Sequence, residues 1–130
     1  INSHLIDKGI KELKKNKKAD SAVTVSKYNM YSPLRARKLN SKGFLIPFVP
    51  LSSFGNINSF NCDKDSQGDV FFADMSHSVT RGKTLRNINK GLLPQKWMGK
   101  KILPVFNSYG CDIDSGWQIS MSERWIKENR

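Results

Sequence analysis

The N-terminal residues alternate between hydrophobic and basic side chains with helical spacing. Ile6, Ile10 and Leu13 share one side of the amphipathic helix that this pattern predicts over 3–18, and lysines occupy much of the remainder. Gly9 lowers the helix propensity but allows close packing against another element. The predicted helix therefore has an apolar face to bury and a basic face in solvent.

Three short apolar runs predict strands. Residues 22–26 are mostly β-branched, and 69–74 and 102–106 are runs typical of buried strands. The chain is expected to turn at 74–76, and Thr84 is placed to cap a short helix. A helix followed by a strand is typical of an α/β unit, so the expected fold class is α/β.

The stretch 27–68 follows neither a helical nor a strand period. Residues 27–42 are irregular and basic, and 52–68 are rich in Ser, Asn, Asp and Gly, as loops are. Between them, 44–51 is apolar, but its two prolines exclude a central strand. We expect either an arm that projects and marks an interface, or an edge strand folded back on its own domain. No repeat or linker divides the chain, so a single domain is expected.

The charge of the chain restricts its partners. Its 130 residues carry 22 Lys and Arg against 11 Asp and Glu, a net charge of +11. Such a surplus favours anionic partners: nucleotides and acidic sugars, or nucleic acid. A third interpretation is that the charge only maintains solubility. Nucleic acid is the least favoured partner, because the lysines of the N-terminal helix have no interleaved aromatic residues on which bases would stack.

Hydropathy and cysteine content indicate a compartment. No apolar run approaches the length that spans a bilayer, and the first residues show no apolar signal-peptide core, so no membrane association is expected. The two cysteines, Cys62 and Cys111, form no Cys-x-x-Cys motif. This usage fits a reducing cytoplasm, and a single Cys62–Cys111 disulfide is the alternative.

The carboxylates with the strongest chemical signal are Asp112 and Asp114. They lie between the strand predicted at 102–106 and a helix whose start Ser115 and Gln118 fit as a capping box. In extended chain their side chains point the same way, toward the sheet edge where open α/β folds bind ligands. Two carboxylates on one side suit Mg²⁺. The alternative is that Asp114 caps the helix and Asp112 is a solvated turn residue.

The motifs of several other chemistries are absent. The sequence has no Gly-x-Gly-x-x-Gly, no Gly-Lys-Ser/Thr phosphate loop, no Gly-x-Ser-x-Gly and no zinc ligand set. Neither histidine lies near a recognisable nucleophile motif. The remaining candidate chemistry uses carboxylates to hold a metal, and Arg and Lys to bind phosphate and carboxylate groups. Nucleotidyl transfer requires this combination.

Four segments match one enzyme family in order. They are the helix around Ile6–Leu13, the Ala-Asp-Ser-Ala-Val-Thr-Val-Ser strand at 19–26, the strand Val70–Ser76 and the acid pair with its helix at Gly110–Glu123. They resemble the second half of the acylneuraminate cytidylyltransferases, or CMP-sialic acid synthetases. In the third segment, Met75 stands where the family has glycine.

The resemblance implies a Rossmann-like, doubly wound mixed sheet, as part of a cytidylyltransferase-like nucleotidyltransferase fold with a projecting dimerisation arm at about 27–68. It implies a homodimer that transfers CMP from CTP to a 2-keto-3-deoxy sugar acid, releasing pyrophosphate. It assigns Asp112 and Asp114 to catalysis and to Mg²⁺ or Mn²⁺.

Four basic residues are the predicted substrate contacts. Arg35 and Arg37 fall in the region that carries the family's sugar contacts, and Lys100 and Lys101 precede the acid pair. The family's Arg-x-Gly-Ser-Lys loop, which cradles the triphosphate, does not occur in these 130 residues, so catalysis is expected to be incomplete without it. A non-catalytic binding or assembly module derived from the same fold is the alternative function.

Overall fold

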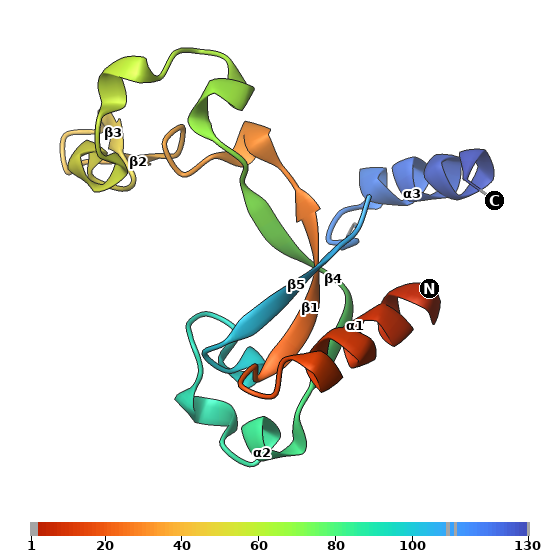
Figure 1. Ribbon diagram of the computed structural model, residues 1–130. Coiled ribbons are helices and arrows are strands. Elements are labelled where there is room, and N and C mark those ends of the chain that lie inside the picture. The colour runs from red at the N-terminus through yellow and green to blue at the C-terminus, as the bar shows by residue number, and fades with distance from the viewer. Residues whose placement is uncertain (1–2, 109, 111, 130) are drawn as a thin grey trace. The chain divides into compact units, whose positions relative to one another are not determined.

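The computed structural model describes residues 3–108, 110 and 112–129, and it divides into two compact units. The first unit combines Ile1–Ser26 with Ala73–Arg130, and the second is Lys27–Phe72. The helices and strands are α1 (Ser3–Lys15), β1 (Ser21–Lys27), β2 (Arg37–Leu39), β3 (Leu45–Pro47), β4 (Phe71–Thr80), α2 (Gly82–Leu85), β5 (Ile102–Phe106) and α3 (Gly116–Glu128) (Figure 1). Short 3₁₀ turns fill much of the remainder.

A mixed three-stranded sheet is the centre of the first unit. Its strand order is β4-β1-β5, and β1 and β5 are parallel, with Ser21 opposite Ile102 and Val25 opposite Phe106. The predicted strands at 22–26 and 102–106 are therefore confirmed, and the fold is α/β. Both parallel strands begin at one edge of the sheet, the amino edge, and end at the other, the carboxyl edge. Open α/β sheets bind ligands outside the carboxyl edge.

Helix α1 packs on the sheet through a glycine. Gly9 is buried, and a Cβ placed there would lie 3.1 Å from Val79 Cγ2 on β4, 3.7 Å from Ala22 Cβ on β1 and 3.8 Å from Val105 Cγ2 on β5. The close packing expected of Gly9 is thus confirmed. Ile10, expected on the apolar face, is 38% exposed, because the helix turns its Gly9–Leu13 stripe to the sheet instead. The core comprises Leu13, Ala19, Ala22 and Val105, with Leu5, Val79 and Leu103 packed against it.

The central strand β1 buries three hydroxyl side chains. Ser21 Oγ donates to the Met98 carbonyl at 2.6 Å, and Ser26 Oγ donates to Asp74 Oδ2 at 2.6 Å. Thr24 Oγ1 donates to the His77 carbonyl at 3.0 Å and accepts from the His77 amide at 2.9 Å. Because each hydroxyl has a partner, the polar positions of β1 are compatible with burial.

Strand β4 differs from its prediction in extent and in burial. The run at 69–74 was expected to be buried and to end in a turn, but β4 continues to Thr80, and Phe71 and Phe72 are each 44% exposed. The turn signal marks an irregularity within the strand: Met75 has φ = 58°, a left-handed conformation. His77, expected in a loop, therefore lies in the strand, and its two ring nitrogens are buried without a hydrogen-bond partner among the described residues.

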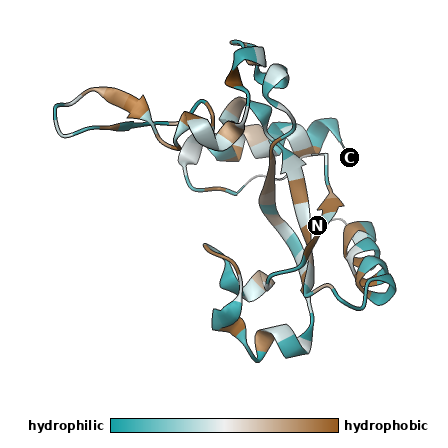
Figure 2. Cartoon of the chain, turned by 60° about the vertical axis from the view of Figure 1, so that its left-hand side comes forward, coloured by the Kyte–Doolittle hydropathy of each residue, from teal (hydrophilic) through white to brown (hydrophobic). Residues whose placement is uncertain are grey.

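The second unit contains an antiparallel hairpin of β2 and β3. Arg37 pairs with Pro47 and Leu39 with Leu45, so the apolar run at 44–51 supplies an outer strand, as its prolines require. The large hydrophobic side chains at 39, 44, 45 and 48 are all more than half exposed, and Figure 2 shows hydrophobic positions in the hairpin. Elsewhere in this unit, Asn29 Nδ2 donates to Asp65 Oδ1 at 2.7 Å and to Asp69 Oδ1 at 3.3 Å. The predicted loop at 52–68 has only 3₁₀ turns.

The short helix α2 begins before the residue predicted to cap it. Its N-cap is Arg81, and Thr84 lies inside the helix, 8% exposed, where its hydroxyl donates to the Asp20 carbonyl at 3.4 Å. The side chain of Thr84 therefore joins α2 to the start of β1. Within the residues that the structure describes, none of the helices combines the length and apolar character needed to cross a membrane.

Candidate functional site

The acid pair follows the carboxyl end of β5 and leads into α3. Gln118 Oε1 accepts hydrogen bonds from the Ser115 amide at 2.6 Å and from the Asp114 amide at 2.8 Å, which confirms the predicted capping box. Since Ser115 is the cap, Asp114 is not, and the cap interpretation of Asp114 is wrong. Its exposed carboxylate has no hydrogen-bond or ion-pair partner in the described part of the chain.

The surroundings of Asp112 fit both interpretations of this residue, a metal ligand and a solvated turn residue. Asp112 is exposed, and its Oδ1 accepts from the Ile113 amide at 3.1 Å. The structure describes no cluster of three or more His, Cys, Asp or Glu side chains that would enclose a metal ion. Two exposed carboxylates nevertheless fit Mg²⁺, because this ion is commonly held by one or two carboxylates together with water and substrate phosphates. Asp112 and Asp114 are the residues that would hold it.

A buried carboxylate, Asp74, lies at the same edge of the sheet. It is 6% exposed, and its Oδ2 accepts from Ser26 Oγ at 2.6 Å and from Asn107 Nδ2 at 3.0 Å. Its Oδ1 accepts from the Ser76 amide at 3.0 Å. Ser26 lies near the end of β1 and Asn107 directly follows β5, so Asp74 ties together all three strands where the parallel pair ends.

Two opposing effects set the pKa of Asp74. Burial raises the pKa, whereas the hydrogen bonds that its carboxylate receives from Ser26, the Ser76 amide and Asn107 lower it. The hydrogen bonds prevail, and the pKa of Asp74 lies below its ordinary value. Asp74 is therefore ionised at neutral pH, and it places a fixed negative charge under the loop that carries the acid pair.

Gly110 connects that loop to Asp74. Gly110 is buried, and a Cβ at this position would overlap the Cβ and Cγ of Asp74. Only glycine allows the backbone to approach the carboxylate this closely. The position of Asp74 thus helps to set the position of the backbone at Gly110. The sequence gives a weak signal for this cluster: a carboxylate, a serine and an asparagine, each at or near the end of a strand.

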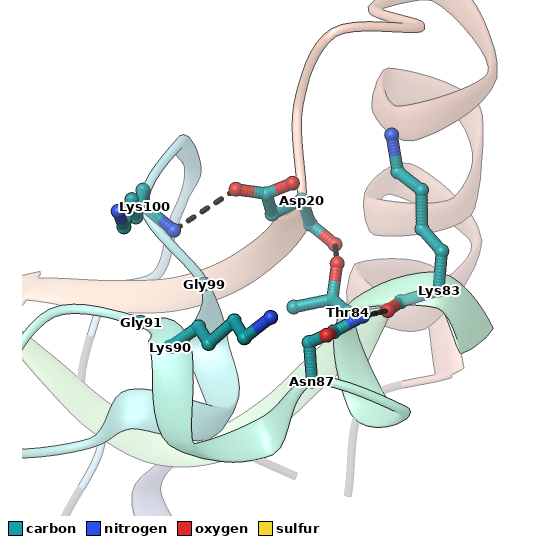
Figure 3. Close-up of a pocket in the computed structure, with 8 residues that line it drawn as sticks. All are labelled: Asp20, Lys83, Thr84, Asn87, Lys90, Gly91, Gly99 and Lys100. Carbon is teal, nitrogen blue, oxygen red and sulfur yellow. Dashed lines mark hydrogen bonds between the residues drawn. The ribbon is translucent and has the colours of Figure 1, made fainter.

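The predicted contacts Lys100 and Lys101 lie at the opposite edge of the sheet. They immediately precede β5, whereas the acid pair follows it, so the structure does not bring these lysines to Asp112 and Asp114. Their backbone amides donate to Asp20 Oδ2 at 2.9 Å and 3.0 Å, and Figure 3 shows the Lys100 bond beside a cavity. A role of Lys100 and Lys101 beside the acid pair is therefore not supported by their location.

Asp20 is a structural junction at the amino edge. The amides of Lys100 and Lys101 lower its pKa most strongly, and the nearby charges of Lys83 and Lys101 add to this effect. Its carbonyl accepts from the Arg81 amide at 3.0 Å. Asp20 thus joins the start of β1 to the segments that precede α2 and β5.

We expect Asp20→Ala to destabilise the chain at neutral pH by about 1–2 kcal/mol, because two backbone donors lose a charged acceptor. The pKa of Asp20 is lowered by folding, so this contribution is complete above the ordinary aspartate pKa and is lost as the pH falls through the lowered value. Urea unfolding of both proteins at pH 7 and at low pH measures it. Asp7→Ala, which removes an exposed carboxylate from α1, is the control; an equal effect of both changes at pH 7 would contradict the assignment.

The predicted contacts Arg35 and Arg37 meet at one cavity in the second unit. This cavity of about 440 Å³ is lined by both arginines, by apolar side chains that include Leu51, Ile57 and Phe60, and by the polar side chains of Asn61 and Gln67. Arg37 Nη1 donates to the carbonyls of Leu34 and Ala36 at 2.8 Å and 3.0 Å, which holds its guanidinium in place. Cations over an apolar wall suit a small organic anion. Cys62, on the same wall, has a free thiol, and Cys111 lies outside the described residues.

Comparisons with known proteins do not identify a family. No protein-family model matches the sequence, and no curated protein matches it significantly. The function must therefore be inferred from the residues and their geometry.

Proposed function

We propose that the chain is part of a CMP-sugar synthetase-like nucleotidyltransferase that transfers CMP from CTP to a 2-keto-3-deoxy sugar acid. The observation that carries the proposal is the exposed acid pair beyond the carboxyl edge, on a loop that packs against the ionised Asp74. In this proposal the fold is a partial, Rossmann-like cytidylyltransferase domain. Mg²⁺, or Mn²⁺, is the metal that Asp112 and Asp114 would hold.

The backbone at Met75 supports the family resemblance. The resembling family has glycine at this position, and the backbone here has φ = 58°, a conformation that glycine adopts without strain and most other residues avoid. At Met75 the chain therefore has the backbone conformation that a glycine would favour. The resemblance was based on the order of the motifs in the sequence. The backbone conformation at Met75 is a separate observation, and it supports the resemblance independently.

The proposed reaction needs few protein groups. The anomeric hydroxyl oxygen of the sugar acid attacks the α-phosphorus of CTP; a phosphorus–oxygen bond forms, the bond to pyrophosphate breaks, and the hydroxyl proton passes to water. The metal supplies neutralisation of phosphate charge. Asp112 and Asp114 would hold this metal, and Asp74 supports the backbone at Gly110. Arg35 and Arg37 line the cavity of the second unit, and in this proposal they bind a sugar carboxylate there, for which guanidinium groups are suited.

The exposed hairpin is the proposed contact between two copies of the chain. Leu39, Phe44, Leu45 and Phe48 are 58–70% exposed, and Lys38 Nζ lies 5.8 Å from the centre of the Phe48 ring. Exposed hydrophobic groups of this kind are typical of protein interfaces. A homodimer formed through the hairpin is therefore part of the proposed function.

Calorimetry of the 130-residue chain tests the proposal. We expect CTP to bind more tightly in Mg²⁺ than in EDTA, and Asp112→Asn with Asp114→Asn to weaken the metal-dependent binding about tenfold or more, because the metal loses its two charged ligands. We expect Arg35→Gln with Arg37→Gln to weaken N-acetylneuraminate binding by a similar factor. Lys38→Gln with Lys42→Gln removes the same charge from the hairpin and is the control.

The outcomes separate the two candidate functions. Metal-dependent CTP binding that requires the acid pair supports nucleotidyl transfer. Sugar-acid binding that needs Arg35 and Arg37, without any binding of CTP, supports the non-catalytic binding module instead. The absence of both kinds of binding would refute both functions.

A further inference from the structure

A second cavity lies at the amino edge of the sheet, at the opposite ends of β1 and β5 from the acid pair. It encloses about 290 Å³ and is lined by Asp20, Lys83, Thr84, Asn87, Lys90, Gly91, Gly99 and Lys100 (Figure 3). Its volume is at the lower end of the range for small-molecule sites. The function proposed above makes no use of it.

The walls of the cavity are held by backbone interactions. Gly99 has φ = 86°, and a Cβ there would overlap the side chain of Asp20. A Cβ at Gly91 would overlap the Lys96 carbonyl, and the Leu92 amide donates to the Gly99 carbonyl at 3.0 Å. Asp20 adds the bonds to the amides of Lys100 and Lys101. The cavity is thus formed by packed segments, and a ligand would not have to order them.

The charges around the cavity are unbalanced. Lys83, Lys90 and Lys100 line it, and within residues 3–108, 110 and 112–129 none of their ammonium groups is paired with a carboxylate. Asp20 is the single carboxylate among the lining residues, and two backbone amides already bind it. Figure 3 shows the Lys90 side chain extending across the cavity and Lys100 beside Asp20, whereas the Lys83 side chain extends away from the other labelled residues. An anion is the complementary ligand.

The neutral side chains add hydrogen-bonding capacity. Asn87 Nδ2 donates to the Lys83 carbonyl at 3.1 Å, which orients the amide and leaves Oδ1 as an acceptor. Thr84 is oriented by its bond to the Asp20 carbonyl. An ammonium group is a point charge that binds phosphate readily, and the Asn87 oxygen can accept from a hydroxyl on the body of the ligand.

We propose that this cavity binds a small phosphate-bearing anion. Inorganic pyrophosphate and sugar phosphates share the group that the lysines recognise, and a sugar phosphate also offers hydroxyls to Asn87. The site is separate from the acid pair and does not depend on the proposed function.

Amide-resolved NMR titration of the chain with pyrophosphate, and separately with ribose 5-phosphate, tests the site. EDTA is present and the ionic strength is fixed, so that the acid pair has no metal and general screening is constant. We expect saturable shifts of the Thr84, Gly91, Gly99 and Lys100 amides for at least one probe. Lys90→Gln with Lys100→Gln should weaken that binding about tenfold or more, because two charged contacts are lost. Asp112→Asn should leave it unchanged.

The matched control is Lys38→Gln with Lys42→Gln, which removes two charges from the hairpin of the second unit. Equal weakening by both double variants would overturn the proposal, since it would reflect general attraction to a chain of net charge +11. Shifts confined to the lysines of α1, or no saturable shift with either probe, would also overturn it. Two outcomes separate the ligand sources. If Asn87→Ala weakens the binding of ribose 5-phosphate but not that of pyrophosphate, the ligand is a sugar phosphate. If the native chain binds pyrophosphate but not ribose 5-phosphate, the ligand is inorganic.

Discussion

Replacing Asp74 by alanine is expected to destabilise the chain by about 3 kcal/mol at neutral pH and to lower its Tm by roughly 10 °C. The change removes the acceptor of the Ser26 hydroxyl, the Ser76 amide and the Asn107 side-chain amide. A donor that loses its partner inside a protein costs about 1–3 kcal/mol, and part of this cost is relieved where water reaches the cluster. Ser26 is only 2% exposed, so its hydroxyl has no ready replacement.

The pH dependence gives this prediction a second measurement. Folding lowers the pKa of Asp74, because the hydrogen bonds to its carboxylate outweigh the effect of burial. A carboxylate whose pKa is lowered by folding stabilises the protein fully at pH values above the ordinary aspartate pKa. This stabilisation disappears as the pH falls through the pKa of the folded chain. The difference in unfolding free energy between the native chain and Asp74→Ala should therefore shrink below about pH 4. Urea unfolding between pH 7 and pH 2.5 measures it.

Two further variants separate charge from hydrogen bonding. Asp74→Asn keeps one acceptor oxygen and should cost less than Asp74→Ala at pH 7, with no acid-dependent change of its own. Asp114→Ala removes an exposed carboxylate of the same first unit and should leave stability almost unchanged. A cost of Asp74→Ala that stays constant down to pH 2.5 would show that the ionised carboxylate is not what stabilises the cluster.

The parts of the fold that the sequence predicts best are those with a local physical signal. Ser115 and Gln118 define the start of α3 because a capping box is satisfied within a few residues. The β-branched residues of β1 and the apolar run of β5 predict strands whatever elements these strands pack against. Burial is less predictable, because it depends on distant partners: Ile10 and Phe71 are apolar and yet exposed, whereas Ser21 is polar and completely buried.

The candidate site shows the same division. The location of Asp112 and Asp114 between a strand and a helix is predictable, because both flanking elements have local signals in the sequence. The environment of Asp74 is not, because Ser26, Asp74 and Asn107 are separated by 48 and 33 residues along the chain and meet only when the sheet forms. For Lys100 and Lys101, proximity in the sequence is misleading. They are near the acid pair in the sequence, but β5 separates the lysines from the acid pair and places the lysines at the other edge of the sheet. Sequence proximity is thus a poor guide to a site when a strand separates its members.

Replacing Gly9 by leucine is expected to cost about 3 kcal/mol or more, which is the upper part of the range for overpacked cores. Gly9 faces one residue from each strand of the sheet, and even a Cβ would lie 3.1 Å from Val79 Cγ2. Three further carbon atoms have no space between α1 and the sheet, so the helix must move away and uncover Leu13, Ala22 and Val105. Thermal and urea unfolding measure this loss.

Gly9→Ala is the matched control for this prediction. Its single methyl group requires Val79 to shift by a few tenths of an ångström, and the gain in helix propensity of about 1 kcal/mol offsets that cost, so the net change should be within about 1 kcal/mol. A leucine variant as stable as the alanine variant would mean that α1 is not held against the sheet through Gly9. Since the sheet also positions Asp74 and Gly110, the leucine variant should lose the metal-dependent CTP binding that we propose together with its stability, whereas the alanine variant should keep both.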